Sequence, residues 1–134
     1  MKKNGFTLIE LLVVLAIMGL VLGVIFSMFS SGIKQGEKTK NRIYLQQEAN
    51  YVSTVLRKTH QNKPEYTIEI TNSEIKIDGI KISDKYNYVA YIKYNKIPYI
   101  NGQKINSSYP VEIEIKFSKD GNDYTLRTTL SRGV

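Results

Sequence analysis

A long apolar run near the amino terminus constrains the fold of this chain more than any other feature. From Phe6 to Phe29 the only charged residue is Glu10. As a helix this run spans about 36 Å, more than the roughly 30 Å hydrocarbon core of a bilayer. Lipid offers peptide groups no hydrogen-bond partners, so such a run satisfies them internally as a helix. The sequence therefore predicts one membrane-spanning helix ahead of a domain of different character.

Two ordinary kinds of segment combine basic residues, here Lys2 and Lys3, with an apolar run. A secretory signal peptide is cut after the run, where small residues such as Ser31 stand. A plain signal anchor is not cleaved and remains in the membrane. Because Lys34 and Lys38 follow the run, charge counting alone leaves its orientation open.

Glu10 is the residue that decides between these kinds of segment. An acidic side chain costs about 2.5–3.5 kcal/mol at the middle of a span on insertion scales, and less near an end. A plain anchor has no use for such a residue. We therefore expect a positively charged partner for Glu10.

The residues around Glu10 resemble a known processing motif. Gly5, Phe6, Thr-Leu-Ile and Glu10, followed by the apolar run, are similar to the cleavage and methylation motif of type IV pilins and pseudopilins. The resemblance implies cleavage by prepilin peptidase after Gly5 and N-methylation of Phe6. It also implies that Glu10 pairs with the amino terminus of a neighbouring subunit during filament assembly. The implied partners are other pilin or pseudopilin subunits, the inner-membrane assembly platform and membrane lipid.

Two details refine this resemblance. Principal subunits of the family often carry a proline late in the apolar helix, whereas this chain has no proline before Pro64 and has Ser27 at about that place. The difference favours a minor subunit. Gly19 and Gly23 form a G-x-x-x-G pair that permits close approach of another helix, although glycine is also common in membrane helices for other reasons.

The chain beyond the run begins with an amphipathic helix. Ser30, Ser31, Gly32 and Gly36 are expected to weaken the helix where it leaves the membrane. Helical spacing then resumes in an apolar stripe made of Leu45, Ala49, Val52 and Leu56. We expect this helix to end near Thr59, before Pro64.

Alternating apolar and polar residues predict antiparallel strands after the helix. One hairpin sets Ile70 against Ile75 and Ile68 against Ile77. A second is centred on Asp120-Gly121, a preferred type I′ turn pair, and sets the following residues opposite each other: Phe117 and Tyr124, Ile115 and Leu126, Val111 and Leu130, and Glu114 and Arg127. Asn101-Gly102 predicts a further turn, and Asp78-Gly79 a bulge or tight turn.

The predicted fold class is α+β, with a long amino-terminal helix packed on a carboxyl-terminal antiparallel sheet, as in pilins. The expected organisation is a leader at 1–5, a transmembrane and assembly segment at 6–29, an amphipathic helix at 30–62 and a β head at 63–134. Before assembly this would be a single-pass membrane protein with its head outside the cytoplasm. After assembly it would belong to an extracellular or wall-spanning filament.

The sequence gives no sign of catalysis, of a cofactor or of a metal. The chain has no cysteine and a single histidine, His60, which stands at the predicted helix end, where a cation is mildly favoured. Glu112 and Glu114 share a strand face, but the hairpin register makes them solvent-facing pairs. We therefore expect a structural protein and not an enzyme. Heavy use of Ile, Lys, Asn and Tyr, without cysteine, favours a Gram-positive source.

Residues 86–96 leave a second function open. Basic and aromatic residues interleave there, a composition that stacks on and neutralises single strands of nucleic acid. Lys93, Tyr94 and Lys96 are the candidate contacts to DNA. Tyrosine is also a good strand former with an apolar ring and a wet hydroxyl, which explains the composition without a ligand.

Three functions follow from these patterns. The first is a minor pilin or pseudopilin of a pilus-like, type II secretion-like or competence filament. The second is a competence-type subunit that binds DNA for uptake. The third is a membrane-anchored domain that never polymerises.

Overall fold

A single helix, α1 (Leu8–Asn62), occupies the first part of the chain. The computed structural model describes residues 7–132. Contacts divide the chain into two compact units, Met1–Thr39 and Lys40–Val134, and we call the second the head unit. The helix is continuous through the Ser and Gly residues at 30–36, so the weakening expected there does not interrupt it. By length and composition α1 is able to cross a membrane.

Eight strands follow in the described chain. Their bounds are β1 (Glu65–Ile70), β2 (Ile75–Ile77), β3 (Ile80–Ser83), β4 (Asn87–Tyr94), β5 (Ile97–Pro98), β6 (Lys104–Asn106), β7 (Val111–Lys119) and β8 (Asn122–Leu130). They form two four-stranded antiparallel sheets, in the orders β3-β2-β1-β6 and β5-β4-β7-β8. The α+β class is confirmed, with the expected antiparallel sheet divided into two.

The chain changes sheet between β3 and β4, between β5 and β6 and between β6 and β7, and the second of these crossings contains the turn predicted at Asn101-Gly102. Gln103 N donates to Ile100 O at 2.9 Å, and Gly102 has φ +81°, which glycine adopts without steric cost. Before the turn β5 pairs with β4, and after it β6 pairs with β1. The side chain of Asn101 continues the pairing of β1, since it accepts from Ile70 N at 2.8 Å and donates to Ile70 O at 3.1 Å.

Both predicted hairpins have the expected register. Ile68 pairs with Ile77 and Ile70 with Ile75 between β1 and β2. All four pairs predicted between β7 and β8 are present. Asp120 and Gly121 have φ +50° and +74°, as a type I′ turn requires. Asp78-Gly79 is a tight turn of the same kind, with φ +51° and +75°.

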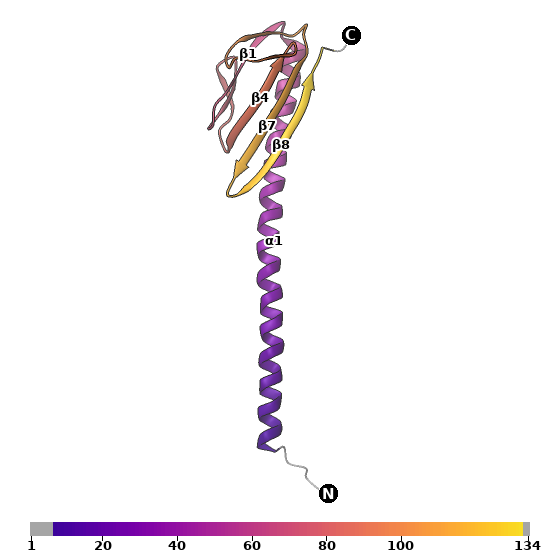
Figure 1. The fold of residues 1–134 in the computed structure, drawn as a ribbon, viewed down its shortest axis with the longest axis vertical. Coiled ribbons are helices and arrows are strands. Elements are labelled where there is room, and N and C mark those ends of the chain that lie inside the picture. The colour runs from indigo at the N-terminus through magenta and orange to yellow at the C-terminus, as the bar shows by residue number, and fades with distance from the viewer. Residues whose placement is uncertain (1–6, 133–134) are drawn as a thin grey trace. The chain divides into compact units, whose positions relative to one another are not determined.

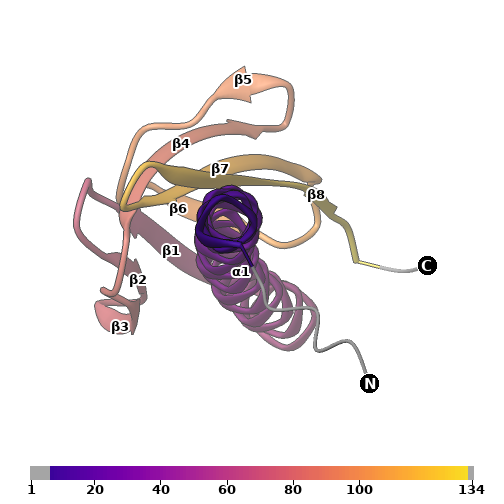
Figure 2. The same cartoon turned by 90° about the horizontal axis from the view of Figure 1, so that it is seen from below.

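The core of the head unit lies between α1 and the two sheets (Figures 1 and 2). Each member of the apolar stripe predicted on the helix is buried, at an exposed fraction of 1% or less. The facing side chains come from alternate strand positions, chiefly Tyr66, Ile68, Ile75, Tyr88, Ile105, Val111, Ile113, Ile115, Phe117 and Leu130. Tyr88 and Phe117 meet edge to face, with ring centroids 5.5 Å apart.

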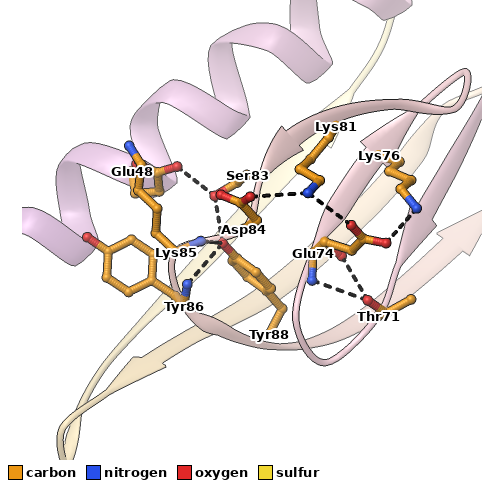
Figure 3. Close-up of polar contacts among 10 residues, drawn as sticks. All are labelled: Glu48, Thr71, Glu74, Lys76, Lys81, Ser83, Asp84, Lys85, Tyr86 and Tyr88. Atoms are coloured by element: carbon orange, nitrogen blue, oxygen red, sulfur yellow. Dashed lines mark hydrogen bonds and ion pairs between the residues drawn. The ribbon is translucent and has the colours of Figure 1, made fainter.

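A chain of hydrogen bonds joins the helix to the segment between β3 and β4 (Figure 3). Ser83 Oγ lies 2.6 Å from Glu48 Oε1 and 2.6 Å from the Tyr88 hydroxyl. A carboxylate only accepts, so Ser83 donates to Glu48 and Tyr88 donates to Ser83. The Tyr88 oxygen in turn accepts from the backbone N–H of Lys85 and of Tyr86. Because the Ser83 hydroxyl is buried and engaged on both sides, it is a structural group.

His60 lies in the last turn of α1, at the helix end as predicted, but its side chain is buried. It continues the buried stripe four residues after Leu56 and is 1% exposed. Burial, and then the positive charge of Arg132, lower its pKa. The ring is therefore neutral at pH 7, because a buried imidazole loses the hydration that stabilises its charged form.

Candidate assembly site

The first turn of α1 contains the candidate assembly residue. Thr7 precedes the helix, and Glu10 is the acidic residue of its first turn. Glu10 N lies 3.3 Å from Thr7 Oγ1, and Thr7 N lies 3.4 Å from Glu10 Oε2. This reciprocal pair is a capping box, in which each side chain satisfies a backbone N–H that the helix leaves free.

The capping box changes the electrostatic argument about Glu10. Its carboxylate lies at the positive end of the helix dipole and accepts two long hydrogen bonds, from the Thr7 backbone and hydroxyl. The negative charge of Glu10 is therefore stabilised in part by its own chain, and not only by the amino terminus of another subunit. The spacing Thr-x-x-Glu was the signal for this cap, and it was missed. Gly5 and Phe6 lie outside the described residues.

Gly19 and Gly23 lie about one helical turn apart on α1. A Cβ added at either position would meet no atom within 4 Å. Neighbouring apolar side chains along this part of the helix are more than half exposed. The pair therefore leaves room for another helix without any cost inside the chain.

Two of the three candidate DNA contacts lie on opposite faces of one sheet. Lys93 and Tyr94 are consecutive in β4, so their side chains point to opposite faces of the sheet. Lys93 lies over the ring of Tyr91, 5.6 Å from its centroid. The Tyr94 hydroxyl accepts from Asn106 N at 3.0 Å. Lys96 is exposed in the turn between β4 and β5, with φ +65°.

The other candidate residues, for metal binding and for paired-carboxylate catalysis, form no cluster in the described chain. Within residues 7–132 no group of three or more His, Asp or Glu side chains is placed to hold a metal ion. Glu114 forms an ion pair with Arg127 at 3.1 Å across the β7–β8 hairpin, as the register predicted. Glu112 is exposed on the same face.

Comparison with known protein families identifies a motif in the amino-terminal segment. Residues 1–26 match the family model described as the prokaryotic N-terminal methylation motif, which includes Gly5, Phe6 and Glu10. No curated protein and no solved structure shows significant similarity to the chain. The motif implies a precursor that prepilin peptidase processes and that assembles with other pilin subunits, and the apolar helix fits membrane anchoring before assembly. With this motif at the start of a long helix that leads into an antiparallel β head unit, the chain is type IV pilin-like in its processing motif and in its architecture.

Proposed function

We propose that this protein is a minor structural subunit of a pilus-like, secretion-like or DNA-uptake filament. Glu10 carries the proposal, because it is the one charge in an otherwise apolar run and occupies the acidic position of the motif. In a filament its carboxylate accepts the methylated amine of Phe6 from a neighbouring subunit. That ion pair forms in a medium of low dielectric constant, where charge attraction is far stronger than in water.

The parts of the chain then take separate roles. Residues 1–5 are removed, and residues 6–29 hold the precursor in the membrane and later pack against other subunits. Residues 30–62 link this segment to the β strands and cover them with the buried stripe of α1. The β head, residues 63–134 within the head unit, lies outside the cytoplasm. The absence of a proline in the apolar run supports the minor-subunit assignment.

Substitutions at Glu10 and Thr7 separate assembly from capping. Glu10→Gln keeps a side chain that fits the third position of a capping box but removes the charge. Thr7→Ala removes the cap and keeps the carboxylate, at a cost of about 0.5–2 kcal/mol in helix stability. We expect Glu10→Gln to be cleaved after Gly5 normally yet to fall at least about tenfold in filament incorporation, a factor that corresponds to about 1.4 kcal/mol. Thr7→Ala should be incorporated almost normally.

The readouts are mass spectrometry of the amino terminus and the amount of protein in sheared filaments. If Glu10→Gln is incorporated as well as the native protein while Thr7→Ala is defective, the carboxylate serves only as a cap. A native mature chain that still begins with Met1, or that begins near Ser31, would contradict the processing step itself.

A further inference from the structure

Asn101 and Gly102 form the one Asn-Gly pair of the chain that lies beyond the predicted leader. In such a pair the glycine nitrogen reaches the side-chain carbonyl carbon of the asparagine with little hindrance, because glycine has no Cβ and a permissive backbone. Asn101 is exposed, so water reaches its side chain as well. The sequence therefore sets a chemically labile pair at one of the crossings between the two sheets.

The reaction open to this pair is deamidation, which needs only water as a co-reactant. Gly102 N bonds to Asn101 Cγ, the Cγ–Nδ2 bond breaks, and the amide nitrogen leaves as ammonia with the proton that Gly102 N gives up. Water then opens the cyclic imide that results. Opening at the side-chain carbonyl leaves aspartate, whereas opening at the main-chain carbonyl leaves isoaspartate, whose backbone runs through the side-chain carbons. Neither product returns to asparagine.

In the folded chain both reacting groups are held by hydrogen bonds to the backbone of Ile68 and Ile70, which we call the β1 flank. Gly102 N donates to Ile68 O at 2.9 Å. Asn101 Oδ1 accepts from Ile70 N at 2.8 Å, and Asn101 Nδ2 donates to Ile70 O at 3.1 Å. The attacking nitrogen and the leaving amide are therefore both engaged, and the attack requires the turn to leave the β1 flank first.

The Tyr99 hydroxyl strengthens the same contact. Its oxygen accepts from Ile68 N at 3.1 Å. Its single proton is shared between Ile68 O at 2.9 Å and Gln103 O at 2.6 Å. One phenol thus joins the β1 flank to the residue that follows Gly102, so separation of the turn from β1 breaks these contacts too.

Deamidation also changes what this position does in the fold. A carboxylate only accepts, so an aspartate here has no donor for Ile70 O and sets two acceptors against each other. Isoaspartate adds a carbon to the main chain ahead of Gly102 and displaces its N–H from Ile68 O. Either product removes hydrogen bonds that join the turn to β1. Because the reaction is not reversed, the altered fraction grows with the age of the protein.

We propose that Asn101 is a deamidation site that the β1 flank protects, and that its conversion to aspartate or isoaspartate releases the turn from β1. Deamidation is slow, so its rate follows the fraction of molecules in which the turn is open. One hydrogen bond shifts such an equilibrium by about two- to tenfold, so three bonds protect the pair by at least about tenfold. The site is independent of Glu10 and of filament assembly.

Trypsin makes the test direct, because cleavage after Lys96 and Lys104 gives a peptide whose one asparagine is Asn101. Full-length protein in nonionic detergent is incubated at pH 7.5, either folded or unfolded in guanidinium chloride, and this peptide is followed by mass spectrometry. We expect Asn101 to deamidate in both samples, at least about tenfold more slowly in the folded protein. Equal rates would show that the fold gives no protection, and no reaction in the unfolded chain would show that Asn101 is not a deamidation site.

Two tyrosine variants connect the rate to the β1 flank. Tyr99→Phe removes the hydroxyl that bonds to Ile68 and should speed deamidation of the folded protein by about two- to tenfold. Tyr109→Phe is the matched control, since it makes the same change at a half-exposed tyrosine whose ring packs on Tyr94, and it should leave the rate unchanged. Equal rates in these two variants would contradict protection by the β1 flank.

A direct substitution tests the release of the turn. Asn101→Asp carries the aspartate product from the start, and it should lower the melting temperature of the head unit. Asn72→Asp adds the same charge at an exposed position between β1 and β2, and it should leave the melting temperature unchanged. If Asn101→Asp melts with the native protein, the turn stays on β1 after deamidation and the proposed release is wrong.

Discussion

Because His60 is buried in its neutral state, the stability of the head unit depends on pH. In the unfolded chain a histidine titrates near 6.5, whereas burial and Arg132 lower the pKa of His60 in the folded chain. Protonation is thus more favourable in the unfolded state. The stability that His60 contributes is complete above about pH 6.5 and is lost as the pH falls from there through the lower, folded-state pKa.

We therefore expect the melting temperature of the head unit to be lower at pH 5.5 than at pH 7.5. The chain has no tryptophan and ten tyrosines, so near-ultraviolet circular dichroism of tyrosine follows the transition. Burial raises the pKa of Asp78, but hydrogen bonds and the charge of Lys63 outweigh it, so the pKa lies below its usual value. The hydrogen bond and charge of Lys116 lower the pKa of Asp123. Both carboxylates therefore titrate below this window. His60→Gln should remove most of the difference, and an unchanged difference would assign it to other groups.

At single residues, sequence reasoning succeeded or failed for identifiable reasons. The motif predicts the acidic position at Glu10, whereas the cap from Thr7 follows from the local spacing Thr-x-x-Glu and needs no partner in another chain. His60 follows Leu56 by four residues and so extends the buried helical stripe by one more turn. This spacing predicts burial more directly than its place near the helix end predicts a charge. Lys93 and Tyr94 were grouped by composition, although adjacent residues in one strand point to opposite faces.

At the scale of elements, the last hairpin depends on the backbone of its turn. Gly121 has φ +74°, yet a Cβ added there would meet no atom within 4 Å. Any cost of Gly121→Ala is therefore conformational and not due to crowding. A left-handed conformation costs an L-residue roughly 1–2 kcal/mol, so we expect this loss in the free energy of unfolding of the head unit.

Asp120→Asn is the matched control, because asparagine tolerates the left-handed conformation at least as well as aspartate. It should change the free energy of unfolding by less than about 0.5 kcal/mol. Chemical denaturation of both variants in the same detergent gives the comparison. Equal stability of Gly121→Ala and the native chain would show that the turn adopts another conformation.

The hairpins were predictable because turn residues and alternation on both faces agreed on one register. The division into two sheets was not, because it depends on contacts between distant residues. β1 pairs with β6 through Tyr66 and Ile105, and Tyr99 and Asn101 continue that edge with their side chains. No local pattern marks an asparagine side chain that takes the place of a strand.

At the scale of the whole molecule, the chain combines a head unit with a buried core and a segment whose apolar side chains have no cover within the described chain. The head unit is folded by its own contacts, whereas the apolar segment finds its environment first in lipid and then, by our proposal, in other subunits. Substitutions on the apolar segment should therefore change assembly and leave the head unit intact.

Gly19 and Gly23 allow this separation to be measured. Replacing both by leucine raises the hydrophobicity of the segment, and a Cβ at either position meets no atom of the described chain within 4 Å. Membrane insertion and the melting temperature of the head unit should therefore be unchanged. Bulky side chains at these positions would keep a neighbouring helix from approaching closely. We expect incorporation into filaments to fall about tenfold, equivalent to about 1.4 kcal/mol, as measured by the ratio of protein in sheared filaments to protein in membranes.

The control enlarges the opposite face of the same helix. Val14 and Val21 lie about half a turn from the glycine pair, and their replacement by leucine changes bulk without closing a gap between small residues. If the glycine and valine variants lose incorporation equally, the segment responds to bulk on any side and the glycines have no special contact. If only the glycine variant loses it, while its amino terminus is still processed at Phe6, close helix packing at Gly19 and Gly23 is a step of assembly distinct from the pairing of Glu10.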